Sequence, residues 1–564
     1  MGLFSKASIV MTPNGVKAGK VYSIKPASGS GDFTFTRATT SSSITGIANK
    51  EASNGLIKSV AANVPRLDYS DGTCPALLLE PQSTNLITYP VSFPNSYWTK
   101  SGASIEGDDN TLGVEVLTNN NFTNGETGWD VGEWVVSTNK AVLTNATTTV
   151  YLKQNGVFDA SKLYKVTFMV DSLSGGVMYI RHGAITGTAF SSEGVHTEYL
   201  TGSSGTLFIR ASTGVSATIS NISVKEVQGF VSPDGTTNAY KLVEGTNNGS
   251  HGAYRSQSSF TPSADYTHSF FVKPSERYKV TIGDASYGTR WGAYNLSTGL
   301  LIDEGSDAVG DTTIEALPNG WYRLSIVTNQ NSNARYPHVK TLSNDYSAGD
   351  VRSYQGDGTS GVYIYGAQLE ALSYPTSLIY NGTEGSTMTR TADLCTNSGT
   401  VNDFNSAEGV LYIEMKALSD DGTPRTISIN GGTSANRVAI QFRATSGQIN
   451  SAIVVGGSAQ SVMPFTISQT IGYIKIALKW KVNDFALWVN GIEVATDTSG
   501  SIFSSDTLNS LDCNDGSSGE GFYGKLEQVQ VYKEALTDKE LYDLTKPLYS
   551  SFDVMANALQ YDII

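Results

Sequence analysis

One proline-rich stretch, residues 33–98, constrains the fold of this chain more than any other segment. Its short apolar runs, such as Leu77–Leu79, are interrupted by Pro65, Pro75 and Pro81. Prolines at this density exclude a long helix, because proline has no backbone N–H and restricts the residue before it. An apolar segment that cannot be helical must be buried as isolated strands against neighbouring domains. The stretch is therefore predicted to be an extended connector docked on the rest of the chain.

The same stretch contains several recognisable sequence motifs. It contains TFTRAT, GLI, VAANVPRLDY and CPALLLEPQSTNL, and residues 366–393 read GAQLEALSYPTSLIYNGTEGSTMTRTAD. These segments resemble a family of virion structural proteins of tailed bacteriophages. The resemblance implies a fibre-type or appendage protein, assembled in the host bacterial cytoplasm, whose N-terminal part contacts other virion proteins. It does not distinguish a tail fibre from a head fibre.

Length and composition indicate several β-rich domains. A chain of 564 residues is too long for one hydrophobic core, and domains of ordinary size would make it three or four. Charged residues make up only 16%, whereas glycine numbers 57 and tyrosine 29, a balance typical of short strands joined by many turns. The net charge of −14 argues against a nucleic-acid partner, which would require a basic surface.

Cysteine content and hydropathy bear on the cellular compartment. Three cysteines, Cys74, Cys395 and Cys513, are too few for a disulfide framework in a chain this long, so we expect all three to be free thiols. The N-terminus lacks the apolar region of a secretion signal, and no apolar run approaches the length of a membrane span. We therefore expect no membrane insertion and assembly in a reducing cytoplasm.

An interruption in the sequence pattern of the host sandwich predicts an inserted domain. The segment YWTKSGASIEGDD looks like the first strand of a jelly roll, but its continuation, FVSPDGTTNAYKLVEG, begins only at Phe230. Residues 111–228 between them have their own beginning and end, and their period-two runs with Gly-Gly and Asn-Gly turns predict a β-sandwich. The opening of this segment, VLTNNNFTNGETGWD, resembles carbohydrate-binding modules of the galactose-binding-like type. Such insertions are tolerated where the two ends of a domain lie close together.

A further domain follows residue 386. The segments EGVLYIEMKA, IKIALKWKVNDFALWVNGIEVA and GFYGKLEQVQVYKEAL resemble a laminin-G or concanavalin-A-like jelly roll. Turns are expected at Asn483–Asp484 and Asn490–Gly491, followed by a short helix capped at Thr537, with Glu540 three residues on.

The predicted fold class is all-β, with several β-sandwich (jelly-roll) domains in series, one of them inserted in another, and an extended N-terminal connector. The expected parts are a particle-attachment arm (1–32), the connector (33–85), a discontinuous host sandwich (86–110 and 229–385), the inserted carbohydrate-binding-module-like sandwich (111–228), the laminin-G-like sandwich (386–545) and an apolar tail (546–564).

No catalytic constellation is evident. The five histidines show no metal-ligand spacing, and neither a Gly-x-Ser-x-Gly elbow nor a glycine-rich phosphate loop occurs. Cleavage of a glycan would require two carboxylates across a cleft, and the acidic pairs lie beside turn residues instead. We therefore expect a protein that is not an enzyme.

Aromatic residues are better candidates for a site, because sugar faces stack on flat rings. The candidates are Trp129, Trp134 and Tyr151 in the insert and Trp291 and Tyr294 in the host sandwich. The alternative for Trp129 is packing in the core.

No cofactor is expected, except that calcium is possible on a sandwich rim, where Asp512, Asn514 and Asp515 are candidate ligands. The alternative for this cluster is an ordinary turn.

The interpretation that follows is a non-enzymatic fibre or spike-type appendage that presents glycan-recognition folds for adsorption to a host surface. The resemblance to phage fibres implies a homotrimer. The connector and the tail also carry apolar residues that lack a core of their own, and burial between subunits would cover them. Two alternatives remain open: a secreted bacterial glycan-binding protein or polysaccharide-degrading enzyme, and a purely structural capsid or tail decoration protein.

Overall fold

The computed structural model describes residues 2–44, 56–70, 75–108, 111–159, 162–182, 185–201, 205–284, 288–308, 312–329, 331–467 and 472–547. Strands account for 49% of the structure and helices for 3%, so the protein is all-β, as its composition predicts. None of the helices in the described part of the chain has the length and apolar character needed to cross a membrane.

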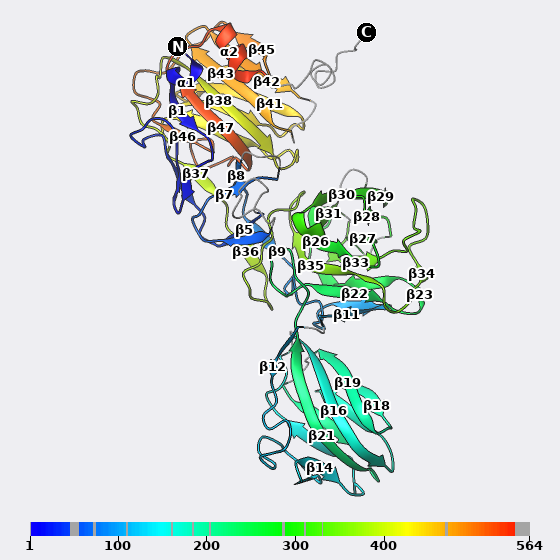
Figure 1. The fold of residues 1–564 in the computed structure, drawn as a ribbon. Coiled ribbons are helices and arrows are strands. Elements are labelled where there is room, and N and C mark those ends of the chain that lie inside the picture. The colour runs from blue at the N-terminus through cyan, green and yellow to red at the C-terminus, as the bar shows by residue number, and fades with distance from the viewer. Residues whose placement is uncertain are drawn as a thin grey trace. The chain divides into compact units, whose positions relative to one another are not determined.

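The chain forms two compact units (Figure 1). The first unit comprises the described residues of Met1–Asn85, Leu372–Gly382 and Met388–Ile564, and the second comprises those of Leu86–Ala371 and Thr383–Thr387. Residues 372–382, expected in the host sandwich, thus belong to the first unit.

A sandwich of two antiparallel sheets forms the body of the first unit. Residues of both sheets, including Leu411, Ile413, Ile427 and Val438, share one buried core. The larger sheet runs in the order β45 (Ile492–Asp497), β44 (Phe485–Val489), β43 (Ile474–Lys481), β38 (Glu408–Ala417), β47 (Gly524–Tyr532), β8 (Ala76–Leu79) and β7 (Arg66–Asp68), and β1 (Ala7–Met11) also pairs with β47. The smaller sheet runs in the order β42 (Ser458–Thr466), β41 (Gln448–Val455), β40 (Arg437–Phe442), β39 (Arg425–Asn430) and β46 (Ser510–Asp512).

Strands from the predicted arm (1–32) and from the predicted connector (33–85) complete this C-terminal sandwich. Strand β1 pairs with Val529–Tyr532 of β47, and β8 pairs with Gly524–Leu526 of the same strand, so the two cover one edge of β47 in succession. Ile9 and Met11 of β1 lie in the core. The strands of the first 85 residues thus close a sheet edge that would otherwise expose unpaired backbone groups, and they belong to the same unit as the C-terminal sandwich.

Leu77–Leu79 show why the expected apolar surface of the connector is absent. Leu77, Leu78 and Leu79 are 0, 5 and 1% exposed within their own unit. No second copy of the chain is needed to cover them, so this part of the argument for a trimer is wrong.

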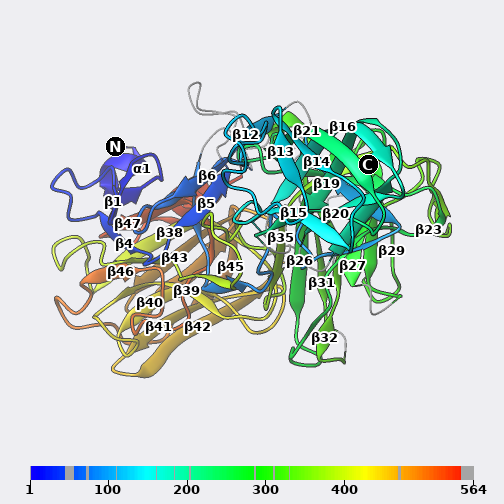
Figure 2. The same cartoon turned by 90° about the horizontal axis from the view of Figure 1, so that it is seen from below.

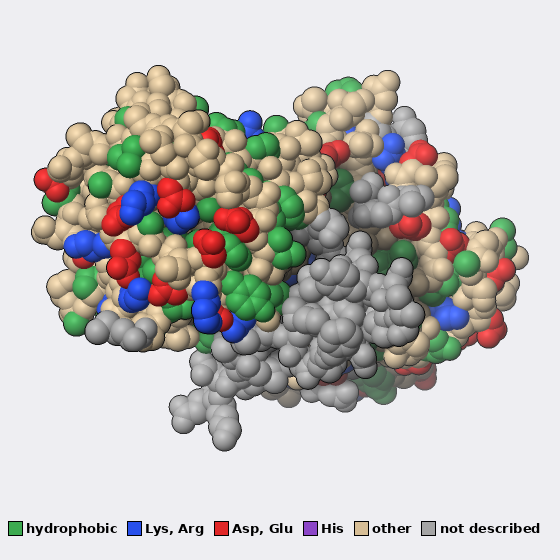
Figure 3. Space-filling view, turned by 90° about the horizontal axis from the view of Figure 1, so that it is seen from above, with side chains coloured by type: hydrophobic (Ala, Val, Ile, Leu, Met, Phe, Trp, Pro, Cys, Tyr) green, Lys and Arg blue, Asp and Glu red, His purple; other side chains and the backbone are tan. Residues whose placement is uncertain are grey.

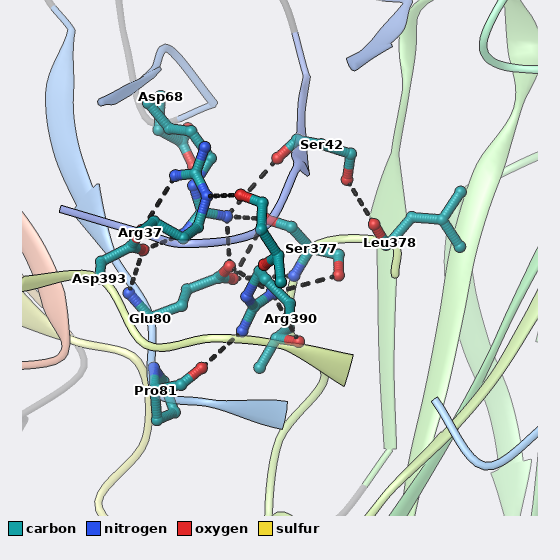
Figure 4. A network of polar contacts seen from close by, with 12 residues as sticks. Arg37, Ser42, Asp68, Glu80, Pro81, Ser377, Leu378, Arg390 and Asp393 are labelled. Atoms are coloured by element: carbon teal, nitrogen blue, oxygen red, sulfur yellow. Dashed lines mark hydrogen bonds and ion pairs between the residues drawn. The ribbon is translucent and has the colours of Figure 1, made fainter. Parts of the chain in front are cut away.

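A buried ion network joins the two segments whose text resembles phage proteins (Figure 4). Arg37 Nη1 lies 3.0 Å from Asp393 Oδ1, and Arg390 Nη1 lies 2.8 Å from Glu80 Oε2. Arg66 pairs with both acids, Glu80 and Asp393. Burial alone would raise the pKa of Glu80, but Arg390 and Arg66 outweigh it and lower that pKa to about 2. Glu80 is therefore held ionised in the interior.

Short strand pairs reinforce the same junction. β4 (Phe33–Thr36) pairs with β37 (Leu394–Thr396), and β9 (Ser83–Asn85) pairs with β36 (Met388–Arg390). The remaining short strands of this unit are β2 (Val16–Lys17), β3 (Lys20–Val21), β5 (Ser41–Ile44) and β6 (Ile57–Val60). The two helices are α1 (Leu3–Lys6) and α2 (Asp538–Thr545). Helix α2 begins with the expected capping box of Thr537 and Glu540.

Charged side chains of opposite sign lie next to one another on the face shown in Figure 3. Lys6 contacts Glu540 at 2.7 Å, and Lys539 contacts Asp543 at 2.6 Å. The expected tail, residues 546–564, lies outside the described residues from residue 548 onward.

The host sandwich of the second unit has two sheets that share a core containing Phe270, Ile282, Leu324 and Val339. One sheet runs in the order β10 (Thr99–Ser101), β24 (His251–Tyr254), β33 (Pro337–Thr341), β27 (Lys279–Asp284), β28 (Trp291–Asn295) and β29 (Leu300–Glu304). The other runs in the order β11 (Ala103–Glu106), β22 (Tyr240–Glu244), β35 (Gly361–Glu370), β26 (Tyr266–Pro274), β31 (Tyr322–Thr328) and β30 (Thr312–Ala316). Short elements at its margin are β23 (Asn248–Gly249), β34 (Tyr354–Gln355), β25 (Gln257–Ser258), β32 (Ala334–Arg335) and the 3-10 turn Pro318–Gly320.

The insert is a sandwich with a core of its own, which includes Leu152, Val166, Phe168 and Ile209. Its larger sheet has the order β13 (Val135–Ser137), β14 (Lys140–Leu143), β21 (Ser216–Val227), β16 (Leu163–Ser174) and β19 (Gly194–Thr201), with β12 (Leu112–Glu115) also on β21. Its smaller sheet has the order β15 (Val150–Gln154), β20 (Leu207–Ala211), β17 (Met178–His182) and β18 (Ile185–Phe190); β15 and β20 lie side by side in Figure 2. Both sheets are built from strands between Leu112 and Val227.

Candidate functional site

A hollow of about 260 Å³ on the host sandwich is the best-built candidate site. We call it the Trp291 pocket. It is lined by Ser250, Thr281, Asp284, Gly288, Trp291, His338, Lys340, Val351, Arg352 and Ser353.

The floor of the pocket follows from strand alternation. On β27 and β33, Ile282 and Val339 point into the core, so the residues beside them point to the opposite face of the sheet. Thr281 lies opposite Lys340, and Gly283 lies opposite both His338 and Trp291. Antiparallel pairing therefore places hydroxyl, ammonium, imidazole and indole groups on one face.

One wall of the pocket is the loop that follows β33. Tyr346 of this loop is buried with Ala293 and Leu342 against the sheet. The carboxylate of Asp303 on β29 accepts hydrogen bonds from Tyr346 Oη at 3.1 Å and from the backbone N–H of Gly349 at 2.9 Å. These bonds fix the loop next to the segment that contains Arg352.

Trp291 and Arg352 form a stacked pair at the pocket. The guanidinium carbon of Arg352 lies 3.9 Å from the centroid of the indole ring, which is a cation–π contact. The indole Nε1 donates to Gly288 O at 2.9 Å, and Arg352 Nη2 donates to the same oxygen at 3.4 Å. Trp291 thus holds the guanidinium in a defined position and has one ring face covered by it.

Two buried polar atoms at the pocket lack partners. Within the described residues, His338 Nδ1 and Thr281 Oγ1 form no hydrogen bond. The two residues are only 3 and 1% exposed. Because a buried polar group without a partner costs about 1–3 kcal/mol, such atoms are rare in native proteins and call for an explanation. A ligand that supplies the missing partner is one such explanation.

The charges around the pocket are unevenly matched. Burial and the nearby charge of Arg352 lower the pKa of Lys340, and no carboxylate of the described residues offsets this effect. Burial and the charge of Lys340 hold the pKa of His338 well below its usual range, so the imidazole is neutral at neutral pH. The carboxylate of Asp284 accepts a hydrogen bond from the backbone N–H of Tyr336 at 3.1 Å.

A glycine makes room for the lysine. A Cβ atom on Gly252, which lies opposite Lys340 on β24, would come within 2.4 Å of Lys340 Cγ. The missing side chain allows the aliphatic part of Lys340 to lie across the neighbouring strand.

The sequence-predicted aromatic residues of the insert do not come together in a site. Trp134 is 1% exposed and lies in the core. Trp129 is also buried, stacks near Phe122 and donates from Nε1 to Asn119 O at 3.1 Å. The rings of both tryptophans are therefore closed to a sugar, as the core alternative anticipated for Trp129. Tyr151 is half-buried, and its hydroxyl accepts a hydrogen bond from Arg181 at 3.2 Å.

The two host candidates differ. Tyr294 is 0% exposed, and its hydroxyl donates to Ser325 O at 2.9 Å inside the sandwich, so it offers no surface to a ligand. Trp291, only three residues earlier on the same strand, lines the pocket.

The candidate calcium ligands serve as turn residues. Asp512 accepts from Asn397 N and Asn430 Nδ2, and Asn514 Oδ1 accepts from Gly516 N. Asp515 Oδ1 accepts from the backbone of Ser517 and Gly519. Among the described residues no cluster of three or more His, Cys, Asp or Glu side chains could hold a metal ion. The alternative of an ordinary turn accounts for these contacts.

A second hollow, of about 600 Å³, lies on the larger sheet of the insert. Its charged groups are already matched: Lys140 Nζ lies 2.7 Å from Asp171 Oδ1, and Ser220 donates to the other oxygen of Asp171 at 2.7 Å. The Trp291 pocket, with unmatched polar atoms, is therefore the stronger candidate.

Sequence reasoning found Trp291 and missed its partners. The strand Pro337–Thr341 alternates apolar and polar residues, which was a signal that His338 and Lys340 share a face. No local signal placed Arg352 over the indole, because its loop is positioned by the long-range contacts of Tyr346 and Asp303.

Fold and pocket define a multidomain β-sandwich protein with a small polar pocket on one sandwich. Its neighbours among solved structures are carbohydrate-binding modules and jelly-roll binding domains. The Ruminococcus gnavus IT-sialidase CBM40 bound to α2,3-sialyllactose is 21% identical, with 25% of this chain and 83% of that chain covered and a TM-score of 0.22. Domain 4 of AbnA, a GH43 extracellular arabinanase from Geobacillus stearothermophilus, is 14% identical over 30% of this chain and 82% of that chain, with a TM-score of 0.23. The heptameric SAP-like pentraxin of Limulus polyphemus is 14% identical over 24% of this chain and 69% of that chain, with a TM-score of 0.21. No protein-family model matches the chain, and no curated protein matches it.

Proposed function

We propose that this chain binds a glycan through the Trp291 pocket and does so as a non-enzymatic appendage of a tailed-phage particle. The observation that carries the binding proposal is the pair of buried, unpartnered atoms His338 Nδ1 and Thr281 Oγ1 beside a tryptophan. Sites for small ligands combine an apolar or aromatic surface with a few placed polar groups.

A sugar is the ligand class that suits this lining. Thr281, Ser250 and Ser353 offer hydroxyl groups, Asp284 accepts hydrogen bonds, and neutral His338 can donate or accept. A hydroxyl-rich ligand satisfies both kinds of group at once. The volume of about 260 Å³ lies just below the range of about 300–1,000 Å³ typical of drug-sized ligands, so one sugar residue fits better than a long stretch of chain.

The virion role is supported by the resemblance of residues 33–98 and 366–393 to phage structural proteins. The buried ion network connects these two segments. Arg37, Arg66 and Glu80 come from the first segment, and Arg390 and Asp393 come from the second. Such a protein would adsorb the particle to a host-surface glycan and contact other virion proteins through its N-terminal part.

The functional form in this proposal is a homotrimer, by the same resemblance. Three linked heads raise the avidity of weak glycan contacts by about 10² or more without any new contact. Light scattering on the full-length protein tests this: a monodisperse monomer of 60.1 kDa at micromolar concentration would end the trimer proposal.

The secreted glycan-binding alternative would use the same pocket, and the decoration-protein alternative would not need it. Antibodies against the chain separate a component of the virion from the secreted alternative. Labelling of purified phage particles is expected, whereas label confined to the culture medium would favour the secreted protein.

Binding itself is tested by titrating full-length protein with oligosaccharides from host surface polysaccharide. Trp291→Ala is expected to weaken binding about 10-fold or more, because Arg352 loses its platform. Tyr179→Ala in the insert, which removes the ring that lies 5.1 Å from Arg210, is the matched control and should leave binding unchanged. Binding by Trp291→Ala at wild-type affinity would overturn the assignment of the pocket.

A further inference from the structure

The geometry points to an anionic sugar as the ligand of the Trp291 pocket, with its carboxylate or phosphate group held between Arg352 and Lys340. This inference rests on the proposed function and names the chemical class of the ligand.

Two cationic groups converge on the pocket. Arg352 and Lys340 both line it, although they come from a loop and from strand β33. Burial is the largest cause lowering the pKa of Arg352, and burial together with the charge of Arg352 lowers the pKa of Lys340. Like charges brought together in a partly desolvated hollow repel each other, and an anion between them removes that repulsion.

Within the part of the chain that the structure describes, neither cation has a carboxylate at ion-pair distance. Among the described residues, the polar contact of Arg352 is the bond to Gly288 O, and Lys340 makes none. The charge of Asp303 acts to raise the pKa of Arg352, but Asp303 Oδ2 already accepts from Tyr346 and Gly349. The fork of N–H donors on a guanidinium matches the two oxygens of a carboxylate or phosphate.

Arg352 is prearranged for this role. Its guanidinium rests on the Trp291 ring at 3.9 Å, so less side-chain freedom is lost when it binds. The same stack covers one face of the indole, which makes Trp291 a support for the cation rather than an open stacking surface for a sugar.

The rest of the lining recognises the neutral part of the ligand. Asp284, the one carboxylate among the described lining residues, accepts from Tyr336 N and brings a hydrogen-bond acceptor to the pocket. Thr281 Oγ1 and His338 Nδ1 supply further partners for hydroxyl groups. Cations for the acid group and polar neutral atoms for the hydroxyls together describe a sugar acid or a sugar phosphate.

The test compares matched ligands on full-length protein by calorimetry or NMR titration. The ligands are a glucuronate disaccharide, its methyl ester, its neutral glucose counterpart and a glucose 6-phosphate disaccharide. We expect the acid to bind about 10-fold or more tightly than its ester and its neutral counterpart, since a charge-assisted hydrogen bond is stronger than a neutral one. The carboxylate and phosphate ligands identify which anion the pocket prefers.

Variants assign the preference to the two cations. Arg352→Gln and Lys340→Gln should each remove most of the preference for acid over ester while retaining binding of the neutral counterpart. Arg210→Gln, which also removes one cation, lies on the insert and should retain the full preference. Equal affinity for acid and ester would overturn the anionic class while leaving the glycan-binding proposal intact, provided that Trp291→Ala still weakens binding. Failure of every sugar to bind would overturn both proposals.

Discussion

Arg37 and Asp393 lie 356 residues apart in the sequence and form an ion pair of 3.0 Å whose two side chains are both fully buried. Next to this pair, Arg66 also contacts Asp393, and Arg390 contacts Glu80. Three guanidinium groups therefore surround two carboxylates in the first unit (Figure 4). A buried charge is tolerated when its partner stays in place, which makes this junction sensitive to the loss of either acid.

Asp393→Asn should destabilise the first unit by about 3–5 kcal/mol, because it leaves the buried charge of Arg37 without its carboxylate partner and removes one of the two partners of Arg66. Urea unfolding of the full-length protein, followed by hydrogen exchange to assign each transition to a unit, measures the effect. Asp543→Asn, which breaks the more exposed pair with Lys539, is the control and should cost no more than about 1 kcal/mol. Equal effects of the two substitutions would contradict a structural role for the network.

Acid should weaken the same unit in a defined window. The pKa of Glu80 is lowered from 4.5 to about 2 in the folded state, so between these values the unfolded chain binds the extra proton. The stability from this group is fully present above about pH 4.5 and is lost progressively as the pH falls toward 2. In Glu80→Gln the free energy of unfolding should be lower at neutral pH and depend less on pH across this window. An unchanged acid slope would show that Glu80 is not held ionised.

The insert is expected to fold by itself. Its two sheets use only strands between Leu112 and Val227, and they enclose a separate hydrophobic core. Residues 111–228 expressed alone should melt in one cooperative transition by circular dichroism. A disordered product would show that the core depends on the host sandwich.

Affinity for an acidic sugar should fall as the pH rises through the alkaline range. The pKa of Lys340 is lowered from 10.5 by burial and by Arg352, so its ammonium loses its charge at a lower pH than an ordinary lysine. His338, which lines the same pocket, does not reverse this sign, because burial and the charge of Lys340 hold its pKa well below its usual range and keep it neutral. Calorimetric titrations from pH 7 to 10 should show the decline, and Lys340→Arg should abolish it.

Local patterns predicted the strands well and their long-range pairing poorly. Period-two runs predicted a β-sandwich over residues 111–228, and the strands of the insert lie between Leu112 and Val227. The Asn483 and Asn490 turns also lie where they were expected, each with the positive φ that asparagine tolerates. By contrast, nothing near β1 signals its pairing with β47, because a strand's partner is chosen by the edge left open in the folded sheet.

The candidate site shows the same division. The choice of tryptophans as candidates found Trp291, which lines the pocket, but Trp134 lies in a core. The large apolar area of an indole favours burial in a core as readily as ligand binding. Which tryptophan borders a pocket depends on Arg352 and on the loop fixed by Asp303, and these contacts exist only in the folded chain.

The most direct test of the account is an experimental structure of the full-length protein with a bound glucuronate disaccharide. The account predicts sugar density in the Trp291 pocket, with the carboxylate contacting Arg352 and Lys340 and a hydroxyl within hydrogen-bond distance of Thr281 Oγ1 or His338 Nδ1. Sugar bound elsewhere, such as in the hollow around Asp171 on the insert, with the Trp291 pocket holding only water, would contradict it.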